Sequence, residues 1–233
     1  MAFTARQLII RAYNLSGIVS KEFQTVSGLQ LKEGVDLLND VLAVATISPS
    51  MVPYATKYSF NAVTGQEKYN IPGLVSAETF TYYLDNVRMS SRAIYRNQYF
   101  GSMKVDVNSL PFAHHFENAI NGSDLYLYFN PDKNYPLEVV GKFGFNTVAD
   151  ENSDLSTMFD AQYLTYLRYA LTRMICEEYT KSTPPFVAMS LKSLELKLKN
   201  KNNKDYSLKK VSFNPANQTG IWGQANIGHG WVI

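Results

Sequence analysis

The chain has 233 residues, of which 45% are hydrophobic and 18% are charged, and its formal net charge is +2. This length supports one or two domains with a core large enough to fold without disulfides, and the apolar fraction excludes a wholly disordered chain. The single Cys176 excludes an intramolecular disulfide framework and a multi-cysteine zinc site. No apolar run approaches the roughly 20 residues of a membrane span. Arg6, Arg11 and Asn14 interrupt the N-terminal segment, so we expect no signal peptide and folding in the cytoplasm.

The first expected element is a helix that follows Thr4. Thr4 and Gln7 have the capping-box spacing, in which each side chain can bond to a free backbone donor of the other. Gly17 is a typical C-terminal stop. The apolar stripe between them is Ala5, Leu8, Ile9, Ala12 and Leu15.

A second helix is expected from Ser27, which has Gln30 three residues later as another capping box. Its apolar residues recur at helical spacing as far as Ser48-Pro49, where the proline ends the helix. Gly34 inside this helix costs about 1 kcal/mol relative to alanine. A close neighbour in the folded chain would account for that glycine.

From about residue 57 to residue 148 the pattern becomes that of β-strands. Short runs of aromatic or β-branched residues occupy 58–60, 68–71, 80–84, 93–95, 125–129 and 137–145. Turn signals such as Thr64-Gly65 and Asn121-Gly122 separate them. The region is therefore expected to be an antiparallel sheet, sandwich or small barrel. Its aromatic excess is explained by cross-strand packing of large rings or by a carbohydrate-binding face.

Two more helices are expected after an acidic linker at 150–154. Asp160 is the expected N-cap of the first, and Thr183 with Pro184 is expected to start the second. The last helix has the apolar stripe Val187, Leu191, Leu194 and Leu198.

Lysines make the end of the chain basic. Seven Lys lie between Lys192 and Lys210 against Glu195 and Asp205, a local net charge of +5. The whole chain carries +2, so the rest carries −3. Three interpretations of this basic stretch are open. It is a solvated helix face, it attracts phosphates of DNA without reading the base sequence, or it contacts an acidic surface of a neighbouring protein. The candidate DNA-facing or acid-facing residues are Lys192, Lys197, Lys199, Lys201 and Lys204.

The segment from residue 206 onward has neither helical nor strand periodicity. It is rich in glycine and asparagine, yet it carries spaced large apolar residues, including both tryptophans. This composition is typical of a segment that folds onto a partner surface, and the alternative is a tail that packs on its own domain. The candidate anchors are Phe213, Ile221, Trp222, Ile227 and Trp231.

These elements predict an α+β protein. Neither helix pair has a core alone, so the N-terminal and C-terminal pairs are expected to form one four-helix core, with an inserted antiparallel β region and an extended C-terminal tail. The expected domains are 1–50 with 155–205 for the discontinuous helical bundle, 51–154 for the β insertion and 206–233 for the tail.

The chain lacks the usual catalytic signatures. It has no Gly-x-Ser-x-Gly elbow and no phosphate-binding loop. His114 and His115 are adjacent, so on a strand they would point to opposite faces and not share a metal ion. Cys176 is expected to be a core residue. We therefore expect no enzyme, no metal and no cofactor. The alternative hydrolase would use carboxylates among Asp150, Glu151, Asp154 and Asp160.

The order of elements resembles the head-to-tail adaptor family of short-tailed bacteriophages, the ring proteins that bind the portal and complete the head. Residues 4–18, TARQLIIRAYNLSGI, are similar to the first helix of that family with its Leu-x-Gly turn. Residues 33–42, EGVDLLNDVL, are similar to its second helix. The strand at 58–60, the glycine-to-tyrosine step at 65–69 and the helical hairpin turn at 179–185 also look similar.

The resemblance implies a structural virion protein at the head-tail junction, made in the cytoplasm of a host bacterium. Such a protein forms a homo-oligomeric ring, commonly of twelve copies, under the portal. The ring extends the channel for double-stranded DNA, makes non-specific contact with that DNA, and connects to downstream tail or nozzle proteins. In such adaptors the C-terminal tail commonly extends along the portal or a neighbouring subunit. The alternatives are a glycan- or surface-binding β module of a phage tail and a cell-wall hydrolase.

Overall fold

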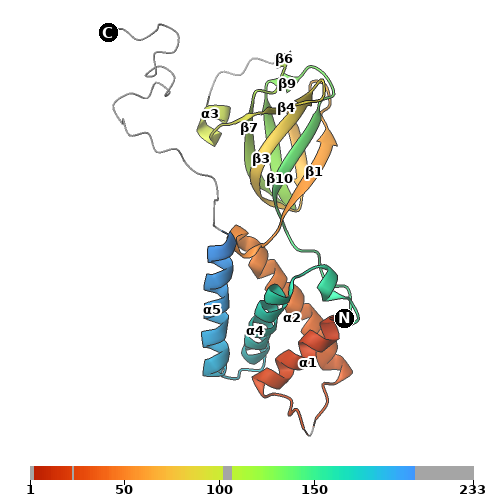
Figure 1. Cartoon of the computed structure of the whole chain (residues 1–233), viewed down its shortest axis with the longest axis vertical. Coiled ribbons are helices and arrows are strands. Elements are labelled where there is room, and N and C mark those ends of the chain that lie inside the picture. The colour runs from red at the N-terminus through yellow and green to blue at the C-terminus, as the bar shows by residue number, and fades with distance from the viewer. Residues whose placement is uncertain (1–2, 23, 102–106, 203–233) are drawn as a thin grey trace, which may run out of the picture. The chain divides into compact units, whose positions relative to one another are not determined.

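The structure is a computed structural model that describes residues 3–22, 24–101 and 107–202. Within these residues it is a mixed α+β fold, as predicted, with helices at both ends of the described chain and strands between them (Figure 1). The helices are α1 (Ala5–Ser16), α2 (Gly28–Ile47), α3 (Arg96–Phe100), α4 (Ala161–Glu178) and α5 (Pro185–Asn202), with the 3-10 turns η1 (Pro49–Met51) and η2 (Leu155–Thr157).

The strands form two four-stranded sheets and a two-stranded one. They are β1 (Ala55–Asn61), β2 (Lys68–Pro72), β3 (Leu74–Leu84), β4 (Val87–Ser90), β5 (Arg92–Ala93), β6 (Asn108–Ser109), β7 (Ala113–Ala119), β8 (Gly122–Tyr128), β9 (Asn130–Pro131) and β10 (Pro136–Phe143). The sheet orders are β1-β10-β3-β4, β2-β8-β7-β5 and β6-β9. The long pairings are antiparallel, as predicted, whereas the short pairings β5-β7 and β6-β9 are parallel.

The two larger sheets share one hydrophobic core. On β2, the buried Tyr69 and Ile71 alternate with exposed neighbours, as expected for a strand with one covered face. Leu127 of β8 and Val139 of β10 are fully buried in the same cluster. The rings of Phe60 and Tyr69, from different sheets, lie 5.5 Å apart. Packing of large rings between sheets therefore accounts for part of the aromatic excess.

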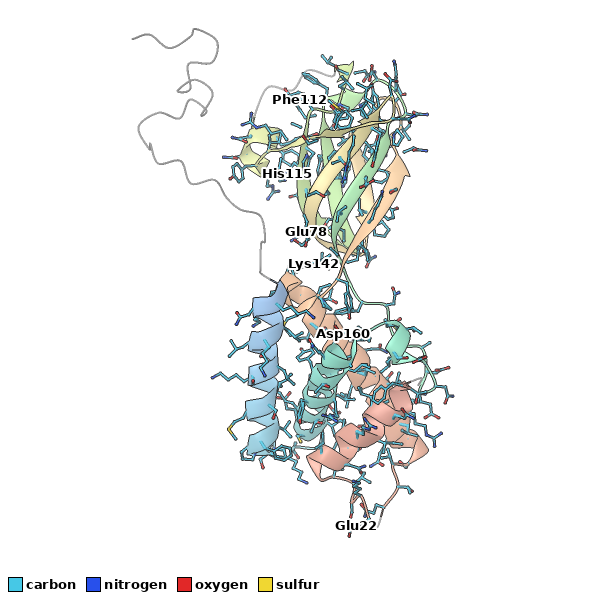
Figure 2. All side chains as sticks on the ribbon, in the orientation of Figure 1. Glu22, Glu78, Phe112, His115, Lys142 and Asp160 are labelled. Atoms are coloured by element: carbon cyan, nitrogen blue, oxygen red, sulfur yellow. The ribbon has the colours of Figure 1, made fainter. Side chains whose placement is uncertain are left out.

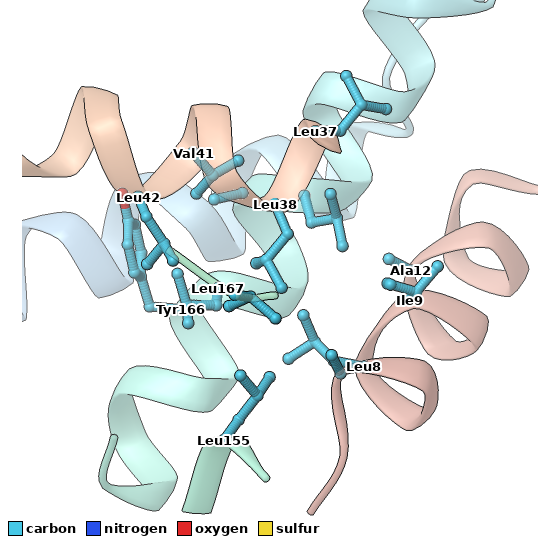
Figure 3. Close-up of a cluster of buried hydrophobic side chains, with 14 of the residues drawn as sticks. Leu8, Ile9, Ala12, Leu37, Leu38, Val41, Leu42, Leu155, Tyr166 and Leu167 are labelled. Carbon is cyan, nitrogen blue, oxygen red and sulfur yellow. The ribbon is translucent and has the colours of Figure 1, made fainter. Parts of the chain in front are cut away.

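The helices are built around a second core. Leu8 of α1, Leu38 of α2 and Leu167 of α4 are fully buried in it (Figure 3). The same cluster includes Leu191 and Leu198 of α5. Segments from both ends of the described chain therefore contribute to one hydrophobic cluster, which the four separate amphipathic helices could not form alone.

The ends of the first two helices follow the predicted local rules. Gln30 donates its backbone N–H to Ser27 Oγ (3.3 Å), and Ser27 donates its own to Gln30 Oε1 (3.0 Å), which confirms that capping box. At α1, the described residues show only one half of the box, the bond from the Gln7 N–H to Thr4 Oγ1 (3.4 Å). Gly17 ends α1 in the left-handed conformation at φ 67°.

Gly34 has the close neighbour that its position suggested. A Cβ atom at residue 34 would lie 2.5 Å from Cγ2 of Ile9, so the absence of a side chain allows α1 to approach α2. Ile9 is itself fully buried. The glycine is therefore a packing requirement between the two helices.

The predicted start of the last helix is wrong by one residue. The N–H groups of Val187 and Ala188 donate to the carbonyl of Pro184, so Pro185 is the first helical residue and Pro184 precedes the helix. Thr183 is therefore too early to be the N-cap. Proline is equally suited to the first helical position at 185, because its fixed φ is helical and that position needs no N–H bond.

The predicted strand at 93–95 is also shorter than expected. Strand β5 ends at Ala93, and Tyr95 is already the residue that precedes α3. The Tyr95 N–H donates to Oε1 of Gln98 (3.3 Å). The hydroxyl of the buried Tyr99 donates to the carbonyl of Leu127 on β8 (3.1 Å). Local capping and this long-range bond favour a helical turn over the β propensity of the sequence.

Candidate partner-binding surface

Part of the predicted surface lies outside the described residues. The residues concerned are Phe213, Ile221, Trp222, Ile227 and Trp231 of the tail, together with Lys204. The remaining candidates, Lys192, Lys197, Lys199 and Lys201, lie on α5. Helix α5 therefore carries the part of the predicted surface that lies within the described residues.

Helix α5 is held by one apolar stripe. Val187, Leu191 and Leu198 are buried, and Leu194 packs against the same helical core. These are the residues that the sequence pattern predicted for the packed side, spaced about one or two turns apart. Lys199 and Lys201 lie in the last turn, where a positive charge favours the helix terminus. The helix contacts α4 and the short turn η1.

The four lysines of α5 are exposed, as predicted for a charged face. Lys201 extends toward the start of α4, with its Nζ 3.9 Å from Oδ2 of Asp160 and 3.5 Å from Oε1 of Gln162. Within the part of the chain that the structure describes, Lys192 and Lys197 form no ion pair. Their charges are available to an external partner, and salt would screen that attraction over about 8–10 Å.

A second apolar stripe lies on the outer side of α5. Phe186, Met189 and Leu196 have 49%, 68% and 53% of their surface exposed. At 100° per residue they fall roughly opposite the packed stripe, with lysines on both flanks. Figure 2 shows side chains extending from α5 on the side away from α4. Sequence reasoning missed this stripe, although the spacing 186-189-196 was a signal for it.

A groove elsewhere on the helices contains two further cations that sequence reasoning missed. It has a volume of about 480 Å³ and is bordered by Arg11 of α1 and Arg168 of α4. Arg11 lies over the ring of Phe3 (5.1 Å), and Arg168 lies over the ring of Tyr169 (5.1 Å). Aromatic contacts of this kind orient a guanidinium group. The groove adds positive charge to the helical surface but brings no catalytic set together.

The four carboxylates considered for hydrolysis have structural partners. The segment 150–154, expected to be a linker, is bonded to the N-terminal segment: the Ala5 N–H donates to the Ser153 carbonyl (3.0 Å). Asp154 accepts from Ser156 and from the backbone of Phe3, and these bonds hold its pKa below the usual range. Asp160 caps α4, as predicted. Of the other two, Asp150 accepts a hydrogen bond from the Ser153 hydroxyl in a turn, and Glu151 forms an ion pair with Arg6 at 3.6 Å. All four carboxylates, Asp150, Glu151, Asp154 and Asp160, therefore have partners within the chain.

The histidines and the cysteine are in packed surroundings. His114 contacts the ring of Phe80 (4.9 Å between centroids), whereas His115 stacks on Tyr99 (6.1 Å), so the two side chains point to different neighbours as predicted. Burial, with a smaller effect of His115, lowers the pKa of His114 to about 4, which keeps its imidazole neutral near pH 7. Cys176 is buried, and burial raises the pKa of its thiol. Among the described residues no three metal-ligating side chains come together.

In comparisons with known proteins, no family and no curated sequence matched the chain. Across the described residues, no helix combines the length and apolarity required to cross a membrane. The surface that stands out by geometry is the outer side of α5, where exposed apolar residues lie between lysines.

Proposed function

We propose that the chain is a subunit of an adaptor ring at the head-to-tail junction of a short-tailed bacteriophage. In this role it binds the portal, extends the DNA channel and connects it to downstream tail proteins. The observation that carries the proposal is the arrangement of elements. Helices from both ends of the described chain share one hydrophobic cluster, a β region is inserted between them, and the lysine-bearing α5 leads toward a segment rich in glycine and tryptophan.

Each part has a physical role in this proposal. The four-helix core, made by the N-terminal and C-terminal helix pairs, builds the contacts of a homo-oligomeric ring of about twelve copies. The lysines attract either an acidic neighbour or the phosphates of passing DNA without reading its sequence. The tail provides aromatic anchors, the residue type that contributes most to binding energy in protein interfaces. The role is structural and located in the virion, and it requires neither a cofactor nor a catalytic residue.

The proposal is tested by binding to the portal protein of the same phage. We expect truncation after Tyr206 to weaken portal binding strongly, and the full-length variant with Trp222→Ala and Trp231→Ala to do the same. Circular dichroism is the control that the helices are retained, and the mass of the free protein is the control that its oligomeric state is unchanged. Portal binding that is equally tight after truncation would remove the role of the tail. A ring that assembles on the portal from dilute protein that is monomeric by itself, seen by mass measurement, would support the function directly.

A glycan-binding β module is the second candidate. The observation in its favour is that Tyr95 and Phe100 expose their rings at the two ends of α3, and Phe112 exposes its ring before β7. Exposed aromatic faces of this kind stack on sugar rings. Phe100 and Phe112 also pack on the rings of Tyr126 (5.3 Å) and Tyr128 (5.5 Å), so Tyr95, with 77% of its surface exposed, is the ring most available to a glycan. Binding on a glycan array that is lost in the Tyr95→Ala variant would favour this candidate, and an array without binding would remove it.

A further inference from the structure

We infer that the outer side of α5 packs antiparallel on the outer side of α2 in a second copy of the chain. The inference deepens the proposed function, because it names the two surfaces that join neighbouring subunits of the ring. It depends on two exposed stripes of the same chain that complement each other in charge and in the spacing of their apolar residues.

The first surface, the α5 stripe, is apolar along its centre and basic at its sides. It consists of Phe186, Met189, Lys192, Leu196 and Lys197, all of them exposed. The opposite side of the same helix is already packed through Val187, Leu191 and Leu198. A helix with apolar residues on two opposed sides has one side without a partner in the described chain. Exposed apolar residues rimmed by charges are typical of an interaction surface.

The second surface, the α2 stripe, combines apolar residues with acidic ones. It consists of Leu29, Asp36, Asp40, Val44 and Ile47, all of them exposed. Ile47 has 79% of its surface exposed, although it ends a helix whose other side forms the core. At 100° per residue these positions lie within about a quarter of the helix circumference. Asp36 and Asp40 form no ion pair within the residues that the structure describes.

Four of the five positions in each stripe match along the axis when the helices run antiparallel. With Ile47 placed opposite Phe186, the rise of 1.5 Å per residue puts Val44 and Met189 both about 4.5 Å along the axis. Asp40 then lies about 10 Å along α2, and Lys192 lies about 9 Å along α5. Asp36 and Lys197 both lie about 16 Å along their helices. The resulting pairs are Ile47 with Phe186, Val44 with Met189, Asp40 with Lys192 and Asp36 with Lys197.

The partner that this pairing identifies is another copy of the chain. Both stripes are exposed in one copy, so they are not in contact with each other there. A contact between two different surfaces of identical subunits is head-to-tail, which generates a ring when the rotation closes. Lys32 is the one basic residue of α2, and the same register places it near Lys201, which is already directed toward Asp160. The register therefore brings opposite charges together in its central part.

The test uses two charge-reversed forms of the full chain and sedimentation equilibrium at low salt. The α5-reversed form carries Lys192→Glu and Lys197→Glu, and the α2-reversed form carries Asp36→Lys and Asp40→Lys. All four positions are exposed, so folding is retained, which circular dichroism checks. A control matched to the α5-reversed form carries Lys21→Glu and Lys133→Glu, which produces the same change in net charge as that form at exposed lysines outside both stripes.

We expect the wild-type chain and the control to self-associate, and the association to weaken as salt is added. Each reversed form alone should lose at least about tenfold in association constant, because charge attraction becomes repulsion at two close pairs. A mixture of equal amounts of the two reversed forms should regain association, since each unlike contact then has opposite charges. That recovery separates the named pairing from a general effect of net charge.

Three results would overturn the inference. One is a wild-type chain that stays monomeric up to about 1 mM, which corresponds to a binding free energy weaker than about −4 kcal/mol. Another is a mixture that fails to regain association. The third is an α5 reversal that leaves self-association intact and instead abolishes retention of double-stranded DNA, in which case the lysines face phosphate. Portal binding is measured separately. A chain that does not bind the portal, but whose two reversed forms regain association when mixed, would contradict the proposed function and leave this pairing in place.

Discussion

Replacement of Gly34 by alanine is expected to destabilise the protein, although alanine is the better residue in a helix. Gly34 lies inside α2, where a Cβ atom would be 2.5 Å from Cγ2 and 3.3 Å from Cγ1 of Ile9. Real Cβ atoms essentially never approach other atoms as closely as 2.5 Å, so one helix must shift or Ile9 must turn. Ile9 is fully buried among α1, α2 and α4, so neither movement is free.

Whether Gly34→Ala raises or lowers the free energy of unfolding depends on two opposing contributions, helix propensity and core packing. Alanine in place of glycine gains about 1 kcal/mol of helix propensity. Overpacking a well-filled core costs about 1–3 kcal/mol. Because the clash is with a branched side chain that has no exposed direction to move, we expect a cost in the upper part of that range. The net result is a loss of about 1–2 kcal/mol in the free energy of unfolding, measured by urea denaturation followed by circular dichroism.

Two further variants make the reasoning specific. Gly28→Ala is the matched control, because a Cβ atom at residue 28 has nothing within 4 Å, and there we expect a gain of up to about 1 kcal/mol. Ile9→Ala alone should cost about 2–5 kcal/mol by leaving a cavity. The double variant with Gly34→Ala should lose less than the sum of the two, since the new methyl group occupies part of that space. Equal stabilisation by Gly34→Ala and Gly28→Ala would refute the close-packing argument.

Two other predictions address the capping box and the buried histidine. Ser27→Ala should cost about 1 kcal/mol of stability, and Ser27→Gly only a few tenths, as measured by the same denaturation assay; equal costs would contradict the capping role. His114 stays neutral in the folded state down to a pKa of about 4, while the unfolded state binds a proton near pH 6.5. The wild type should therefore lose up to about 3 kcal/mol as pH falls between those values, and His114→Gln should show a smaller fall over the same range. An identical pH profile for both would show that the imidazole is accessible to protons in the folded state.

The helices were predictable where local chemistry decides their limits. The capping box at Ser27, the left-handed Gly17 and the aspartate cap at Asp160 each have a bonding role that depends on residues close by in sequence. The start of α5 was misplaced because Pro184 and Pro185 are both acceptable as the first helical residue, and only the hydrogen bonds separate them.

The β region was predictable in several of its strands but not in their pairing, and β4 (Val87–Ser90) and β7 (Ala113–Ala119) lie outside the runs that the sequence pattern identified. Alternation identifies a strand such as Lys68–Pro72, yet it does not say that β1 lies next to β10, with Ala55 opposite Lys142. That pairing brings together residues far apart in sequence, and many alternative pairings share the same pattern. Helix α3 was missed for a related reason, because the contact that buries Tyr99 comes from β8.

The outer side of α5 shows why a charged face is easily interpreted as merely solvated. Lysines that flank an apolar stripe make its exposure in a single copy tolerable. Their aliphatic stems cover apolar neighbours, while their charged ends stay solvated. The same charges favour an acidic partner over a neutral one when that stripe is buried. In the pairing proposed above, Lys192 and Lys197 beside Leu196 would serve both as a hydrated face in one copy and as the charges that select an acidic partner, which is why charge counting alone could not separate the two roles.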